Sequence, residues 1–294
     1  MLDKTNIFHQ KVSESIKFEV NLYHIFEYFR HAHPRQYLQR KPMYVVSGNH
    51  DVEGDLLTGV MYEAFENRFR MPRIQKPVIG RVTLPQHVDL NKMYRLPYDY
   101  GNSFYSYSNG MMHNIVLNSF ADFEPGSNQY RWLLADLESI DRQEVPWVMV
   151  SVHCPIYNTF SKHQNDPQPI QMKKHLEPLL VQYRVNFIVA GHLHAYSRSK
   201  PVANNLLTRT GPIHIVLGNG GRQANAPFQS QIPEEWVIMR DHTTYGYGTI
   251  QVLNKTSVLY EWVQTGRNEA DSSRKKFPTI NMTDFVYVEN QFFL

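Results

Sequence analysis

Trp147-Val-Met-Val-Ser-Val152 runs directly into His153-Cys154-Pro155, and Phe187-Ile-Val-Ala190 runs directly into Gly191-His192-Leu193-His194. Both apolar runs are short, rich in β-branched residues and bounded by turn-forming residues, which predicts buried strands. Ligands of open α/β sheets sit outside the carboxyl ends of the strands. Two strands that each end in histidine therefore indicate both the fold class and the edge of the sheet where a site would lie.

Three more apolar runs have the same character: Met43–Ser47, Asn114–Leu117 and Ile213–Leu217. The first of them ends in Gly48-Asn49-His50-Asp51, so a third strand end carries polar residues that can bind a ligand. We expect Asn49, His50, His153, His192 and His194 to converge at one edge of one sheet.

Helical patterns lie between these runs, one from the capping residue Ser127 through Glu138 and one over 175–183. Beyond residue 210 the pattern changes to strands, with a hairpin formed by Thr249–Leu253 and Ser257–Val263. We predict an α/β fold in which two mixed sheets pack face to face with flanking helices. The predicted organisation is a divergent or truncated segment over 1–40, a catalytic domain over 41–205 and a C-terminal region over 206–294 that completes the second sheet.

The side chains at the strand ends suit a metal ion. Imidazole is a good ligand for zinc and iron, and an Asn carbonyl is a neutral oxygen ligand. In extended geometry the rings of His192 and His194 would lie about 7 Å apart on one face, which suits two ions rather than one. A lone histidine at a strand end is more often a hydrogen-bonded structural residue, so the prediction depends on several of them occurring together.

The order Gly-Asn-His-Asp, Val-His-x-Pro and Gly-His-x-His resembles the metallophosphoesterases. Three longer segments narrow this resemblance to the purple acid phosphatases: Gly191-His-Leu-His-Ala-Tyr-Ser-Arg198, Tyr245-Gly-Tyr-Gly248 and Asn118-Ser-Phe-Ala-Asp-Phe-Glu-Pro-Gly126. The resemblance covers roughly residues 40–290. It implies an acid phosphatase that hydrolyses phosphate monoesters at a binuclear centre of Fe³⁺ with Zn²⁺, Mn²⁺ or Fe²⁺.

The resemblance also implies a role for each residue at a matching position. Asn49, His153 and His192 match the ligands of the divalent ion, and His194 matches the imidazole on the ferric ion. His50 matches the catalytic residue that contacts the substrate phosphate and assists the leaving group.

Three neighbouring residues are assigned less directly. His163 lies where the family places further substrate-binding histidines, although a solvated loop histidine is the alternative. Arg198 either supports the His194 loop or, as we expect, lies on the surface. Cys154 is expected to be a packed residue without a reactive thiol.

The sequence departs from the family before Gly48, where it has one Asp, Asp3, and lacks the two earlier motifs that supply the remaining metal ligands. Tyr23 is the nearest match, but Val20 stands where the carboxylate should be. The sequence is therefore either truncated at its start, which we favour, or it diverged and lost part of the site. In either case the first strands of the sheet would be missing, and we expect at most one divalent ion in this chain.

Composition narrows the partners. The net charge of +3 is too small to indicate nucleic acid, and no apolar run is long enough to span a membrane. We expect small phosphorylated substrates and a secreted, vacuolar or lysosomal protein, although residues 1–17 do not form a signal peptide. Asn254 and Asn281 begin glycosylation sequons. The alternatives are a phosphodiesterase or phosphoprotein phosphatase of the same superfamily, and a truncated or non-catalytic binding module.

Overall fold

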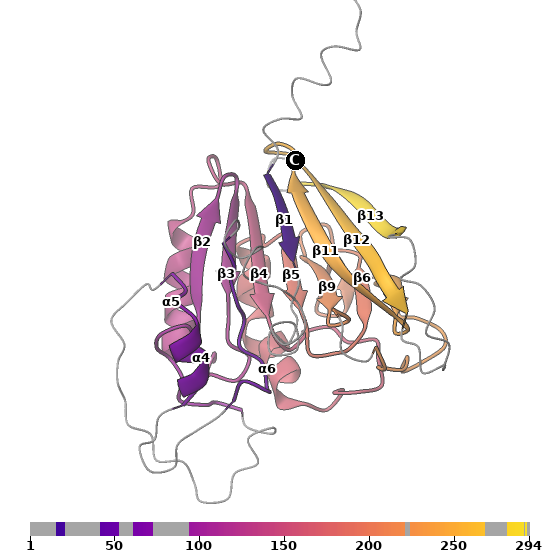
Figure 1. The fold of residues 1–294 in the computed structure, drawn as a ribbon. Helices are drawn as coiled ribbons and strands as arrows, with labels where there is room; N and C mark the ends of the chain where they lie inside the picture. The colour runs from indigo at the N-terminus through magenta and orange to yellow at the C-terminus, as the bar shows by residue number, and fades with distance from the viewer. Residues whose placement is uncertain are drawn as a thin grey trace, which may run out of the picture.

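The computed structural model describes residues 16–20, 42–52, 61–72, 94–220, 224–267, 281–290 and 292. Two β-sheets pack face to face, with helices against the outer face of the larger sheet (Figure 1). The two-sheet α/β sandwich predicted from the sequence is confirmed. No helix in the described ranges is long and apolar enough to cross a membrane.

The larger sheet has seven strands in the order β10-β6-β9-β5-β4-β3-β2. Its central strands β3, β4, β5 and β9 are parallel, and β2, β6 and β10 run antiparallel to their neighbours. The bounds are β2 Tyr105–Asn109, β3 Met112–Val116, β4 Trp147–Val152, β5 Phe187–Ala190, β6 Tyr196–Ser199, β9 Ile213–Leu217 and β10 Val237–Asp241. The predicted strands at Trp147–Val152, Phe187–Ala190 and Ile213–Leu217 have these bounds, and Asn114–Leu117 is displaced toward the C-terminus relative to β3.

The second sheet has the order β1-β11-β12-β13 and is antiparallel throughout its described strands. Its strands are β1 Ile16–Val20, β11 Thr244–Val252, β12 Ser257–Arg267 and β13 Asn281–Glu289. The predicted hairpin is formed by β11 and β12, which pair antiparallel. A separate ribbon pairs β7 Val202–Ala203 with β8 Leu206–Leu207.

The core has two layers because successive side chains of a strand point to opposite faces. From β4, Trp147 and Met149 enter the layer between the two sheets, whereas Val148 and Val150 enter the layer under the helices. The helices are α4 Glu63–Arg68, α5 Asn128–Ser139, α6 Pro167–His175 and α7 Glu177–Gln182. As predicted, Ser127 caps α5, its side chain accepting a hydrogen bond from Tyr130 N at 3.2 Å.

The structure corrects one expectation. Met43–Ser47 is not a strand: both backbone polar groups of Val45 bond to the Tyr105 hydroxyl, at 2.9 and 2.7 Å, instead of to a neighbouring strand. On the second sheet, Phe285 and Tyr287 of β13 are largely exposed. Val20, which stands where the family has a carboxylate, is the last residue of β1. Asp3 and Tyr23 lie outside the described residues.

Candidate metal centre

Two of the predicted site residues follow neighbouring parallel strands. His153 comes directly after β4, and Gly191 and His192 come directly after β5. A hydrogen bond from Gly191 N to the His153 carbonyl, 3.0 Å long, holds the two strand ends together. The sequence pattern thus positions both histidines at the carboxyl edge of the larger sheet.

The third loop, Gly48–Asp51, is closed by its own residues. Gly48 N donates to Asp51 Oδ2 at 2.8 Å, and Asp51 N donates to the Gly48 carbonyl at 3.1 Å. This turn presents the side chain of Asn49 to the strand-end histidines.

Three ligand-type atoms meet where these loops converge. His153 Nε2 lies 2.9 Å from Asn49 Oδ1 and 3.1 Å from His192 Nδ1. The three residues are far apart in the sequence, and the cluster is partly buried. Because each atom carries a lone pair, the cluster is chemically suited to a cation.

Gly48 is required for this approach. A Cβ added at Gly48 would lie 2.7 Å from His153 Cε1 and 2.9 Å from His153 Nδ1, closer than real contacts allow. On its other side, the His153 ring packs near Phe120 with ring centroids 5.8 Å apart. Backbone and aromatic ring together fix the imidazole that stands at the centre of the cluster.

The other nitrogen of His192 faces a carboxylate that the sequence analysis did not predict. Asp166 Oδ2 lies 3.3 Å from His192 Nε2 and 2.8 Å from His163 Nδ1. Hydrogen bonding from His192 lowers the pKa of Asp166, against the opposing effect of burial. Burial lowers the pKa of His192. A neutral His192 that donates a hydrogen bond from Nε2 to Asp166 would present the lone pair of its Nδ1 to His153 Nε2.

His163 belongs to the same group of side chains. Its ring centroid lies 4.0 Å from that of His192. His163, Asp166 and His192 each offer an atom within 4.8 Å of the others, so this trio is a second possible donor set on the far side of the His192 ring. Both histidines have positive φ, 61° and 62°, a backbone conformation that surrounding contacts must hold.

The remaining predicted residues are less closely placed. His50 is exposed, but its charge contributes to lowering the pKa of His192, so it lies near the cluster. His194 follows on the same loop as His192, and its carbonyl accepts from Asn225 N at 3.1 Å.

Two neighbours of the cluster have clear outcomes. Cys154 is fully buried and burial raises the pKa of its thiol, which confirms the prediction of a packed, unreactive residue. Arg198 was expected on the surface, and this was wrong: it is 6% exposed and paired with Asp284.

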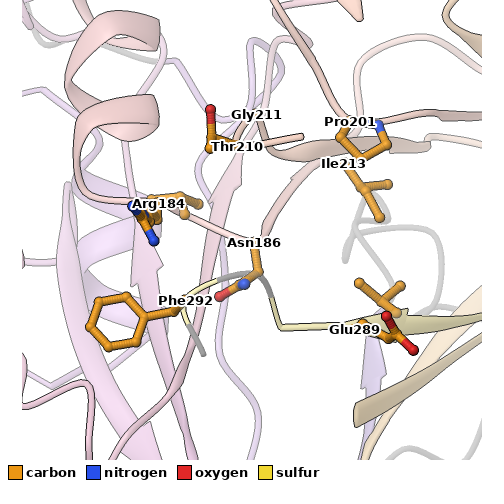
Figure 2. Close-up of a pocket in the computed structure, with 10 residues that line it drawn as sticks. Arg184, Asn186, Pro201, Thr210, Gly211, Ile213, Glu289 and Phe292 are labelled. Atoms are coloured by element: carbon orange, nitrogen blue, oxygen red, sulfur yellow. The ribbon is translucent and has the colours of Figure 1, made fainter. Parts of the chain in front are cut away.

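Asn186 and Ile213 line a pocket (Figure 2). They lie at or next to the starts of β5 and β9, whereas the histidine cluster follows the ends of β4 and β5, so the pocket is at the opposite edge of the sheet. This pocket is therefore separate from the predicted site.

The donor atoms fit one metal ion. Zinc–nitrogen and zinc–oxygen bonds of about 2.0–2.2 Å at tetrahedral angles separate two ligand atoms by about 3.3–3.6 Å. The observed 2.9 and 3.1 Å would need to open by only a few tenths of an ångström. A carboxylate behind a ligand histidine is the usual arrangement in metal sites, because it fixes the tautomer and ring orientation.

A family model described as calcineurin-like phosphoesterase matches residues 13–196, and one described as iron/zinc purple acid phosphatase-like protein C matches residues 211–273. The chain belongs to the calcineurin-like phosphoesterase family. The resemblance stated from the motifs is confirmed, whereas the predicted domain boundaries remain a prediction.

Curated relatives are named purple acid phosphatases. Probable purple acid phosphatase 20 of Arabidopsis thaliana is 32% identical over 238 residues, which cover 81% of this chain and 50% of that protein. Purple acid phosphatase 18 of the same plant is 34% identical over 193 residues, 64% of this chain and 44% of the relative. The chain spans about half the length of the curated relatives it matches.

A solved structure supports the fold. A purple acid phosphatase from yellow lupin (Lupinus luteus) seeds superposes with a TM-score of 0.59 at 21% identity, covering 83% of this chain and 40% of that one.

Proposed function

We propose that this protein hydrolyses phosphate monoesters and that Asn49 Oδ1, His153 Nε2 and His192 Nδ1 hold a divalent metal ion for this reaction. The proposal is carried by one observation: Asn49 Oδ1 and His192 Nδ1 both lie within 3.1 Å of His153 Nε2. Three protein ligands with an open fourth position are typical of a catalytic rather than a structural metal site.

The bound ion supplies Lewis-acid chemistry, lowering the pKa of water and neutralising phosphate oxygens. The residues of the chain perform the other tasks. Asp166 accepts the Nε2 proton of His192 and keeps the Nδ1 lone pair available to the ion. His163 is held by the same carboxylate at 2.8 Å and would bind the substrate phosphate.

His50 is proposed to assist the leaving group. It is exposed, so a substrate can reach it, and it is close enough to the cluster to influence the charge of His192. A histidine beside the departing oxygen can donate a proton to it as a general acid.

The family implies a binuclear centre, with Fe³⁺ beside Zn²⁺, Mn²⁺ or Fe²⁺. In this chain His194 is the residue assigned to the ferric position. One neutral imidazole compensates little of the charge of a trivalent ion, so we propose that this chain holds about one divalent ion.

The proposed location is secreted or vacuolar, by likeness to the relatives. Asn254 is compatible with this because it is exposed in the turn between β11 and β12. Peptide mapping of protein from its native source tests glycan attachment at Asn254, and unmodified peptide throughout would contradict the proposal.

The function is tested with an aryl phosphate monoester and the matching diester at mildly acidic pH, after loading with Zn²⁺ or Mn²⁺. We expect slow, metal-dependent turnover of the monoester that disappears in His153→Ala. Turnover of the diester alone would instead support the phosphodiesterase. Metal binding without any turnover would support a non-catalytic module.

A further inference from the structure

An ion pair joins the two sheets through β6, the strand that follows the histidine loop. Arg198 of β6 donates from Nε and from its NH2 nitrogen to the two carboxylate oxygens of Asp284 in β13, each at 2.7 Å. Tyr196 Oη donates to Asp284 as well, at 2.6 Å. Arg198 and Tyr196 share one face of β6, so both reach toward the second sheet.

The pair is buried. Tyr196, Arg198 and Asp284 are 0%, 6% and 9% exposed. Burial raises the pKa of Asp284, but the hydrogen bonds from Arg198 and Tyr196 outweigh it and hold the pKa below its ordinary value. Tyr196 also stacks on Trp262 of β12, with ring centroids 3.9 Å apart. The rest of the layer between the sheets is mainly apolar, and apolar contacts do not hold one sheet in a single orientation on the other. The bidentate pair has a defined geometry and therefore does.

The loop that carries the histidines ends where β6 begins. Within it, Leu193 N bonds to the Gly191 carbonyl and Ala195 N bonds to the Leu193 carbonyl, both at 2.7 Å, and His192 has a φ of 62°. Such tight, strained backbone persists only where its surroundings hold it.

Strand β9 forms one side of that support. Gly218 N donates to the Ala195 carbonyl at 3.1 Å, and a Cβ at Gly218 would lie 1.7 Å from the Leu193 oxygen. Strand β6 pairs with the end of β9 through Tyr196 and Leu217. Any displacement of β6 is therefore passed to the loop.

We propose that Arg198 and Asp284 are positioning residues that fix β6 against the second sheet and thereby set the orientation of the His192 and His194 imidazoles. The inference rests on the proposed function insofar as those imidazoles are metal ligands. It makes β13, at the far end of the chain, part of the support of the metal centre.

The test compares Asp284→Asn, which keeps the size and removes the charge, with Val258→Ala as a control. Val258 is fully buried in the same layer but lies near the start of β12, four residues before Trp262. The double variant Arg198→Met/Asp284→Leu separates stability from orientation, because apolar replacement of a buried pair often preserves stability. Melting temperature, imidazole ¹H–¹⁵N spectra of the metal-free protein and Co²⁺ affinity are measured for each.

Asp284→Asn is expected to shift the His192 and His194 resonances and to weaken Co²⁺ binding about tenfold or more. Val258→Ala is expected to lower the melting temperature without shifting the histidine resonances or weakening Co²⁺ binding. The double variant is expected to recover the melting temperature but to keep the shifted resonances and the weaker Co²⁺ binding. Wild-type resonances and Co²⁺ affinity in a destabilised Asp284→Asn protein would overturn the proposal. If wild-type protein fails to bind Co²⁺, the proposed function fails, and the resonances of the metal-free proteins alone decide this inference.

Discussion

Replacing Asp166 by Asn removes the carboxylate behind His192 while keeping its size. Metal affinity should fall, because an amide no longer fixes the proton on His192 Nε2, and the Nδ1 lone pair is then not reserved for the ion. Losses of this kind are about 10–100-fold, or about 1.4–2.7 kcal/mol. The contact is 3.3 Å long and the Asp166 side chain is 34% exposed, so solvent weakens it and we expect a loss near tenfold.

The assay is competitive titration of Zn²⁺ or Co²⁺ against a chromophoric chelator at neutral pH. Because the pKa of Asp166 is lowered, its carboxyl group is ionised at neutral pH. Its stabilising effect is fully present above its ordinary pKa and is lost as the pH falls through the lowered value. Asp136→Asn is the matched control. It breaks a similar contact, His113 Nε2 to Asp136 Oδ2 at 2.9 Å, at the start of β3 rather than beside the cluster.

Two results would refute the reasoning. Wild-type affinity in Asp166→Asn would remove Asp166 from the metal site. A loss far above 100-fold, matched by His163→Ala, would instead make His163, Asp166 and His192 the ligands.

Three further predictions follow from single contacts. Gly48→Ala should weaken metal binding roughly tenfold by displacing the His153 ring, whereas Gly266→Ala, whose Cβ would meet Tyr245 at an ordinary 3.7 Å, should not; equal titration curves would contradict this. His153→Ala should abolish tight metal binding yet barely change the melting temperature of metal-free protein, and the reverse pattern would make His153 a packing residue. Burial lowers the pKa of His214 to about 3. The free energy of unfolding of the metal-free wild-type protein should therefore decrease as the pH falls from about 6.5 toward that value. Denaturant titrations across that range should show a smaller decrease for His214→Gln, and parallel curves for the two proteins would argue against this.

The parts of the fold that were predictable are those where local pattern and tertiary environment agree. Strand β4 is wholly buried between parallel neighbours, so a continuous apolar run describes it. Met43–Ser47 has the same composition but obtains its hydrogen bonds from the Tyr105 hydroxyl, a partner that no local pattern reveals.

The same limit applies to the site. The convergence of Asn49, His153 and His192 was predictable because each follows an apolar run, whereas their role as metal ligands stays a prediction. Asp166 was not, because it acts through contacts with rings from other loops, although its spacing from His163 was a usable signal. Arg198 was assigned to the surface because its partner, Asp284, lies on a different sheet.

The metal content of the purified chain, measured by elemental analysis beside its visible spectrum, is the most direct test of the proposed three-ligand site. We expect about one divalent ion per chain, absent in His153→Ala, with no tyrosinate band and only slow, metal-dependent hydrolysis of the monoester. Two tightly held ions with turnover near the enzyme median of about 10 per second, or an ion that survives the loss of His153, would contradict it.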